Sequence, residues 1–483
     1  MVGKAPARNG GAIPLADVPS ACTTPGHTAA ERAELFWAGV RSVGTGQVAL
    51  SWTSRTSLER YRSTGLAHPR AIQLGAQEEA IDKVLARPHR LEALGAIHMW
   101  RTATAEQVAA IIGSPLVSSP RSIDLRLLFS AGLAQRGAAF AGDRRGIAPT
   151  LWRPDIAARE MGFERRLSYA EWLGIYAAQE WSWGSQAGWH NLLVTELSLR
   201  VAEHTPIGTI FGELLAGARV LFPFDEQLAR SRRSADAVWV RDDGLRIVVE
   251  ATATAAAAFR GRLEHWIDAL LADPDRSTVV LFVDVSDPDN IRSRPDHLVR
   301  RRIVDAVTAT PERVAAGIAE RICFARYKDW FPGRGLVHPS FFGLRVDRPT
   351  GPAGERWEPV DLLDPYAVPF APADHEAARA PIVHAGNLFG VPHWLRGPGL
   401  DLEAVVRRLA GFPPPEPMSS ERRAELVSRF SGRPGAPDPG APAQDGHGDP
   451  TAPTATDPLP TAARATRHLA LGPRGVGDER GGS

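Results

Sequence analysis

Two short apolar stretches, residues 235–240 and 245–251, dominate the hydrophobic pattern of the central region. Both are rich in Val, Ile and Trp, and stretches of this length and composition are typical of β-strands. The turn residues Asp242, Asp243 and Gly244 separate them. They predict a hairpin loop that is closed by Gly244 in the left-handed region.

The register of this hairpin brings two acidic residues together. If Arg241 pairs with Leu245, Asp236 lies directly opposite Glu250. Directly opposed side chains share one face of the sheet, with Cβ atoms roughly 5 Å apart. Two carboxylates at that separation repel each other unless a positive charge lies between them. We therefore expect a divalent cation, Mg²⁺ or Mn²⁺, between Asp236 and Glu250.

A second pattern, between residues 87 and 152, predicts three helices and a β-hairpin. The first helix carries Leu91, Leu94 and Ile97 at helical spacing, and the second begins at the capping-box sequence 104–107 and ends at Gly113. Ser119 and Pro120 supply an N-cap and a first-turn proline for the third helix, and strands at 133–136 and 150–152 flank a loop at 142–146. This order predicts a winged helix-turn-helix.

In a winged helix the third helix enters the major groove and the wing lies on phosphates. We expect Ile123 and Leu127 to face the core of this domain. The predicted contacts with double-stranded DNA are Arg121, Ser122, Arg126, Arg144 and Arg145. Residues 121–166 hold nine arginines against five acidic residues, which favours DNA as the partner. Docking of another protein is the alternative for such a domain.

The rest of the central region alternates helices and strands. The predicted elements are a helix at 190–201, a strand at 219–224, the hairpin, an amphipathic helix at 255–273, a strand at 279–285, and helices at 298–307 and 313–322. This order predicts an α/β sandwich with a central mixed sheet. Glu196 is an acidic residue on the otherwise apolar face of its helix.

These features resemble two related groups of proteins. A buried strand that begins with Asp236, followed by a hairpin and a strand ending in Glu250-Ala251-Thr252, is similar to the core of the PD-(D/E)XK nuclease superfamily. More narrowly, residues 87–346 resemble the replication-relaxation family of actinobacterial plasmids and integrative elements. That resemblance rests on a winged helix, a helix that begins at His190, and the Asp236 and Glu250 strands.

The resemblance implies site roles. Asp236 and Glu250 would hold the metal ion, and Glu196 matches the first-helix acid that often joins such a site. The superfamily's lysine is missing, because Thr252 stands in its place. Arg260, on the following helix, is the remaining cation expected to face the site. An arginine acts there as an electrostatic clamp and is a poor acid or base.

Three functions are compatible with these features of the sequence. The first is a DNA-binding protein of a mobile element, acting in plasmid replication or conjugative transfer initiation, whose nuclease-like domain is a degenerate scaffold. The second is an active metal-dependent DNA endonuclease directed by the winged helix, and the third is a transcriptional regulator. Replication or transfer proteins and a second copy of the chain are the candidate protein partners.

The sequence divides into segments of different composition. We expect a disordered arm at 1–28, a helical lead-in at 29–86, the winged helix at 87–166, the nuclease-like α/β domain at 167–346, an irregular extension at 347–410 and a disordered tail at 411–483. Residue 28 is expected to cap a helix that runs through Phe36 and Val40, and a strand is expected at 47–52.

Composition narrows the classes of function. A chain of 483 residues is long enough for two or three domains, and its net charge of +1 argues against a uniformly basic coat. Two isolated cysteines do not form a disulfide framework, and three central histidines lack metal-ligand spacing. No nucleophile elbow or glycine-rich phosphate loop is visible. The longest central apolar run, residues 279–285, is too short to cross a bilayer, so we expect a cytoplasmic protein.

Overall fold

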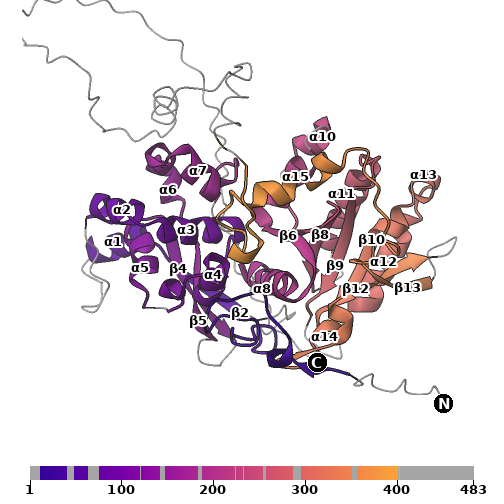
Figure 1. Cartoon of the computed structure of the whole chain (residues 1–483), viewed down its shortest axis with the longest axis horizontal. Helices are drawn as coiled ribbons and strands as arrows, with labels where there is room; N and C mark the ends of the chain where they lie inside the picture. Colours follow the sequence, from indigo (N-terminus) through magenta and orange to yellow (C-terminus); the bar gives the residue numbers. More distant parts are fainter. Residues whose placement is uncertain are drawn as a thin grey trace, which may run out of the picture. The chain divides into compact units, whose positions relative to one another are not determined.

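A seven-stranded mixed β-sheet forms the centre of the α/β fold (Figure 1). The computed structural model describes residues 11–40, 48–63, 76–119, 121–141, 147–182, 188–222, 225–231, 233–253, 257–286, 295–350, 356–400 and 402. All of them belong to one contact-defined unit, residues 1–434.

The strands of the large sheet follow the order β13-β12-β10-β9-β8-β7-β6. Their bounds are β6 (Ile207–Gly212), β7 (Ala237–Arg241), β8 (Arg246–Thr252), β9 (Thr278–Asp284), β10 (Ile322–Arg326), β12 (Arg345–Thr350) and β13 (Arg356–Asp361). Strands β8, β9 and β10 are parallel, and the strands on either side are antiparallel. This confirms the predicted mixed sheet.

Helices cover both faces of this sheet. On one face α8 (Gly188–His204) accepts a hydrogen bond at Ser198 from the indole of Trp239, at 2.8 Å. On the other face, α11 (Ala257–Leu271) packs Phe259 against Phe282, and α12 (Pro295–Val307) packs beside α11. The helices predicted at 190–201, 255–273 and 298–307 are therefore confirmed.

The remaining helices of the described residues lie around this sheet and around a second, four-stranded sheet. They are α1 (Arg55–Ser63), α2 (Gln77–Leu85), α3 (Pro88–Trp100), α4 (Ala105–Ile112), α5 (Ile123–Ser130), α6 (Ala157–Glu160), α7 (Tyr169–Tyr176), α9 (Ala218–Leu221), α10 (Glu226–Ala229), α13 (Pro311–Ala315), α14 (Tyr327–Trp330) and α15 (His375–Ala385). None of the described helices has the length and apolarity of a bilayer-spanning segment.

The helices α3, α4 and α5 pack with an antiparallel four-stranded sheet of order β2-β4-β5-β3. Its strands are β2 (Val48–Thr53), β3 (Ala103–Thr104), β4 (Ala134–Ala141) and β5 (Ile147–Pro154). The Thr104 side chain accepts from the Gln107 amide and the Gln107 side chain accepts from the Thr104 amide, so the predicted capping box is present. Gly113 ends α4 with a φ of 73°.

The third helix of this group begins later than the sequence predicts. Ser122, and not Ser119, is the N-cap of α5, because its hydroxyl oxygen accepts from the Leu125 amide. Ser119 instead accepts from the Arg121 amide in the preceding turn. Ile123 is 64% exposed, and the core side chains of α5 are Leu125, Leu128 and Phe129.

Two predicted elements of the large sheet are wrong. The strand before the hairpin is β6, whereas the stretch predicted at 219–224 begins within α9. A helix was expected at 313–322, but the chain forms α13, a 3-10 turn at Ile318–Arg321 and then β10. Short apolar runs do not distinguish a strand from a buried helical turn.

The predicted disordered arm and irregular extension are also wrong for their described residues. In the arm, Leu15 and Cys22 are buried, and β1 (Ile13–Pro14) pairs with β11 (Leu336–Val337). Residues 28–40 form turns, not a helix, while β2 confirms the strand expected at 47–52. The extension supplies β13 and α15. The predicted tail at 411–483 lies outside the described residues.

Candidate functional site

The β7–β8 hairpin has the predicted register. Gly244 has a φ of 96°, and the Arg241 amide donates to the Leu245 carbonyl at 2.9 Å. Ala237 pairs with Val249, which sets the preceding residue, Asp236, opposite Glu250. The Ala251 amide donates to Asp236 Oδ2 at 2.7 Å and fixes this carboxylate beside β8.

Glu250 is buried against the large sheet. It is 3% exposed, and its Oε1 accepts a 2.7 Å hydrogen bond from the Trp266 indole. Oε2 lies 3.3 Å from Nε of Arg262. Trp266 and Arg262 are one turn apart on α11, so this helix supplies a hydrogen-bond donor to one oxygen of the carboxylate and a positive charge beside the other.

Burial raises the pKa values of both acids. Burial, and then the charge of Glu250, raises the pKa of Asp236 well above its usual range. Burial also raises the pKa of Glu250 to about 7, although the charge of Arg262 and the Trp266 hydrogen bond oppose the shift. The arrangement therefore favours a pair of carboxyl groups that holds a proton near neutral pH.

A third acid, Glu213, lies close to the pair and was missed in the sequence. It follows β6 in the turn Glu213–Leu215, and its charge helps to raise the pKa of both carboxyls. Its Oε2 accepts from Asn191 Nδ2 at 2.5 Å, and its carbonyl accepts from Ser234 Oγ at 2.7 Å. The strand before the hairpin was expected at 219–224 and not at the position of β6, so the sequence did not indicate that Glu213 lies beside the hairpin.

The cation at the pair is Arg262, not Arg260. Arg260 is exposed on α11, whereas Arg262 reaches Glu250. Positions two apart on a helix point in nearly opposite directions, since each residue turns it by about 100°. The signal for Arg262 was its spacing from Trp266, which places both on the face that covers β8. Arg262 also helps burial to lower the pKa of His190 to about 3.

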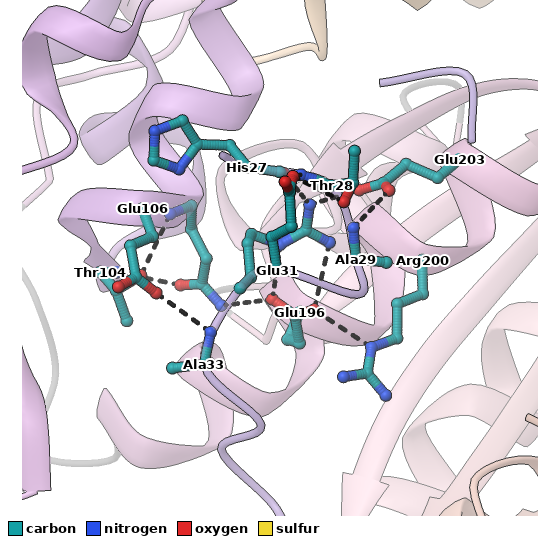
Figure 2. A network of polar contacts seen from close by, with 12 residues as sticks. His27, Thr28, Ala29, Glu31, Ala33, Thr104, Glu106, Glu196, Arg200 and Glu203 are labelled. Carbon is teal, nitrogen blue, oxygen red and sulfur yellow. Dashed lines mark hydrogen bonds and ion pairs between the residues drawn. The ribbon is translucent and has the colours of Figure 1, made fainter. Parts of the chain in front are cut away.

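Glu196 does not join the carboxylate pair, contrary to the sequence prediction. Figure 2 shows it within a network of charged groups around α8. Arg32 contacts its Oε2 at 3.0 Å and its Oε1 at 3.1 Å, and Arg200 contacts Oε1 at 3.1 Å. Burial favours the protonated form, but the two arginines outweigh burial and lower the pKa of Glu196. Its oxygens are therefore occupied by cations of the protein.

The same network holds the N-terminal segment on α8. Arg32 also bonds Glu203, and Glu203 accepts from the Ala29 amide at 2.7 Å (Figure 2). The Ala33 amide donates to Glu106 of α4 at 3.0 Å. Since Arg32 is 4% exposed, these partners stabilise a charge that would otherwise be buried without compensation.

The donor set at the hairpin does not fit a metal ion. Asp236 Oδ2 and both oxygens of Glu250 already face donors of the protein. Thr252, which the sequence resemblance places where a lysine would be expected, is 1% exposed and neutral. Within the described ranges, no group of three or more His, Cys, Asp or Glu side chains is arranged to hold a metal. The Mg²⁺ or Mn²⁺ expected from the sequence therefore gains no support from this geometry.

The α5 surface presents part of the predicted DNA contacts. Arg121 and Arg126 are exposed, and the exposed side chains of Ile123 and Leu116 accompany them. Ser122 is not available as a contact, because it is 6% exposed and its hydroxyl donates to the Leu116 carbonyl at 2.8 Å. The wing residues Arg144 and Arg145 lie outside the described residues.

The acidic residue of α5 faces away from this surface. Asp124 is 8% exposed, and its carboxylate contacts Arg90 at 2.5 Å and His89 at 3.2 Å. The exposed part of the helix thus carries the positive charges of Arg121 and Arg126 without the acid between them. Comparison with protein-family models, curated proteins and solved structures finds no match to this chain in any of the three.

Proposed function

We propose that the chain binds double-stranded DNA through α5, with Arg121, Ile123 and Arg126 as the contact residues. The observation that carries this proposal is the exposure of Ile123 and Arg126 on the last of three packed helices and of Arg121 in the turn before it, while Asp124 points inward. Arginines bind phosphates and guanine edges, and an aliphatic side chain contacts the thymine methyl group. This is the use expected of a winged helix.

The wider role we propose is in replication or transfer initiation of a mobile element. The large sheet would then serve as a scaffold and not as a nuclease, which is supported by Thr252 at the lysine position and by the occupied oxygens of Asp236 and Glu250. Binding to DNA would place the protein in the cytoplasm. The family resemblance of residues 87–346 is the basis for the mobile-element part of this proposal.

The test is the double variant Arg121→Ala/Arg126→Ala in a fluorescence-anisotropy titration of duplex DNA at several salt concentrations. Loss of two phosphate contacts should lower the slope of log K against log salt by about 1.8, since each contact contributes about 0.9. We expect binding to weaken at least tenfold at low salt.

A matched control removes the same charge elsewhere. Arg230 and Arg301 are 76% and 79% exposed and form only surface ion pairs, so Arg230→Ala/Arg301→Ala changes net charge equally. We expect this variant to keep both the affinity and the salt slope. If both double variants lose affinity equally, net charge and not the α5 surface explains binding, and the proposal fails.

The second candidate function is a metal-dependent endonuclease, favoured by one observation: Asp236 faces Glu250 across the hairpin. Supercoiled plasmid incubated with the protein and Mg²⁺ or Mn²⁺ tests it directly. We expect no nicking above that of the Glu250→Gln variant. Metal-dependent nicking by the native chain that Glu250→Gln abolishes would replace the scaffold role with catalysis.

A further inference from the structure

A cavity of about 340 Å³ lies against one face of the large sheet, beside strands β6, β7 and β8. Helices α7, α9 and α15 surround it, and α15 lies beside β6 at this edge of the sheet (Figure 1). Small-molecule sites in proteins range from roughly 300 to 1,000 Å³, so this volume suits a small ligand.

The walls of the cavity are mainly apolar. The sheet contributes Phe211, Val238 and Val240, and the other apolar walls come from Leu221 of α9 and from Leu388 after α15. On α15 the lining residues are Ala377, Ala380 and Pro381, whose small side chains leave the space open. An apolar body would displace water from these walls with a gain in free energy.

One charged side chain, Arg246 of β8, lines this apolar space. Its Nη1 donates to the Leu221 carbonyl at 2.7 Å. Among the described residues, no carboxylate oxygen lies within 4.0 Å of its guanidinium, whereas Arg241, Arg326 and Arg348 of the same sheet each have such a partner. Burial lowers the pKa of Arg246, and only the charge of Asp273 opposes that shift.

A half-buried guanidinium without an anionic partner leaves donors unsatisfied. A bound carboxylate could accept two parallel hydrogen bonds from it, which is the strongest pairing available to arginine. The cavity therefore combines an apolar body with an anion-binding end.

The backbone at the cavity is also unusual. Ala177 and Ala178 line it with φ values of 50° and 57°, in the left-handed region that alanine rarely adopts. Strained residues of this kind cluster at functional sites. Ala177 is the C-cap of α7 and its amide donates to the Leu173 carbonyl, so these two residues end the helix at the wall of the cavity.

We propose that this cavity binds a small amphipathic carboxylic acid, with its carboxylate on Arg246 and its apolar part between α15 and the sheet. The site is distinct from the α5 surface and from the Asp236–Glu250 pair. The inference does not depend on DNA binding.

The probe is octanoate, compared with octanamide, which has the same apolar chain and no charge. Calorimetric titration of the full chain should give an affinity for octanoate at least tenfold higher than for octanamide. Arg246→Met should remove this difference and leave octanamide binding intact, whereas Arg246→Lys should retain part of it. The matched control Arg348→Met, on the far side of the same sheet, should behave as the native chain.

A second variant tests the location independently of the charge. Ala380→Phe adds a ring at the α15 wall and should abolish binding of both compounds. Thermal unfolding of each variant checks that the fold is intact; if Arg246→Met does not fold, Ala380→Phe decides alone. Equal affinities for acid and amide, no binding of octanoate, or unchanged binding in Ala380→Phe would each overturn the proposal.

Discussion

The Asp236–Glu250 pair makes the stability of the protein depend on pH in an unusual direction. The perturbation is Glu250→Gln, which removes one acid and keeps an oxygen for the Trp266 indole. In the native chain the pKa of Glu250 rises from its ordinary 4.5 to about 7, because of burial. The folded state therefore binds more protons than the unfolded state between these values.

The sign and size follow from this shift. The contribution of Glu250 to the free energy of unfolding is fully present below about pH 4.5 and is lost as pH rises to about 7. A shift of this size corresponds to about 3 kcal/mol, because one pKa unit is worth 1.36 kcal/mol. The free energy of unfolding of Glu250→Gln, relative to the native chain, should rise by up to that amount between pH 5 and pH 8.

Urea unfolding followed by tryptophan fluorescence at pH 5, 6, 7 and 8 measures this difference. Subtracting the native curve cancels the titration of groups that do not interact with Glu250. Asp236 is the exception, because the charge of Glu250 raises its pKa. The control is Glu226→Gln, at a glutamate whose side chain is 82% exposed, which should show no pH-dependent difference. A constant difference between Glu250→Gln and the native chain across this range would refute the raised pKa. Stabilisation of the native chain by Mn²⁺ at pH 8 would favour the metal site instead.

Three further substitutions test other parts of the structure. Arg32→Ala leaves Glu196 and Glu203 buried without their partner and should cost about 3–5 kcal/mol in urea unfolding, whereas Arg230→Ala should cost less than about 0.5 kcal/mol. Gly244→Ala should cost about 2 kcal/mol or more, because φ is 96° and the new Cβ would lie 2.4 Å from the Ala378 carbonyl oxygen; a loss below 0.5 kcal/mol would mean that the turn relaxes. Thr104→Ala should cost about 1 kcal/mol through loss of the capping box, and a Thr104→Ser variant should restore most of it.

The hairpin was predictable because its signals are local. Alternating apolar residues and the turn that ends at Gly244 fix the register without reference to the rest of the chain, and the register places Asp236 and Glu250. The capping box at Thr104 was visible for the same reason. Side-chain partners were not predictable in this way. Glu196 meets Arg32 across 164 positions of sequence, and nothing near either residue indicates the other.

Small shifts in element boundaries explain most of the other errors. The helix α5 begins at Ile123. This residue was expected in the core but is exposed, and Ser122, which was expected to contact DNA, is instead the N-cap of the helix. On α11, a difference of two positions exchanges Arg260 for Arg262 at the carboxylate pair. Periodicity over many residues determines whether a helix forms, whereas a shift of one or two positions changes which side chain makes a given contact.

The segment after α15 makes the two sheets mutually dependent. The Phe389 amide donates to the Gly174 carbonyl, and the indole of Trp100 donates to the Gly390 carbonyl. Farther along, the Trp394 indole donates to the Ala202 carbonyl of α8. A fragment cut from the chain at residues 87–166 would keep Trp100 without the Gly390 carbonyl and would leave the buried indole of Trp100 in water. The surface proposed to bind DNA is therefore not part of a portable module, and it must be studied in a chain that extends at least to residue 396.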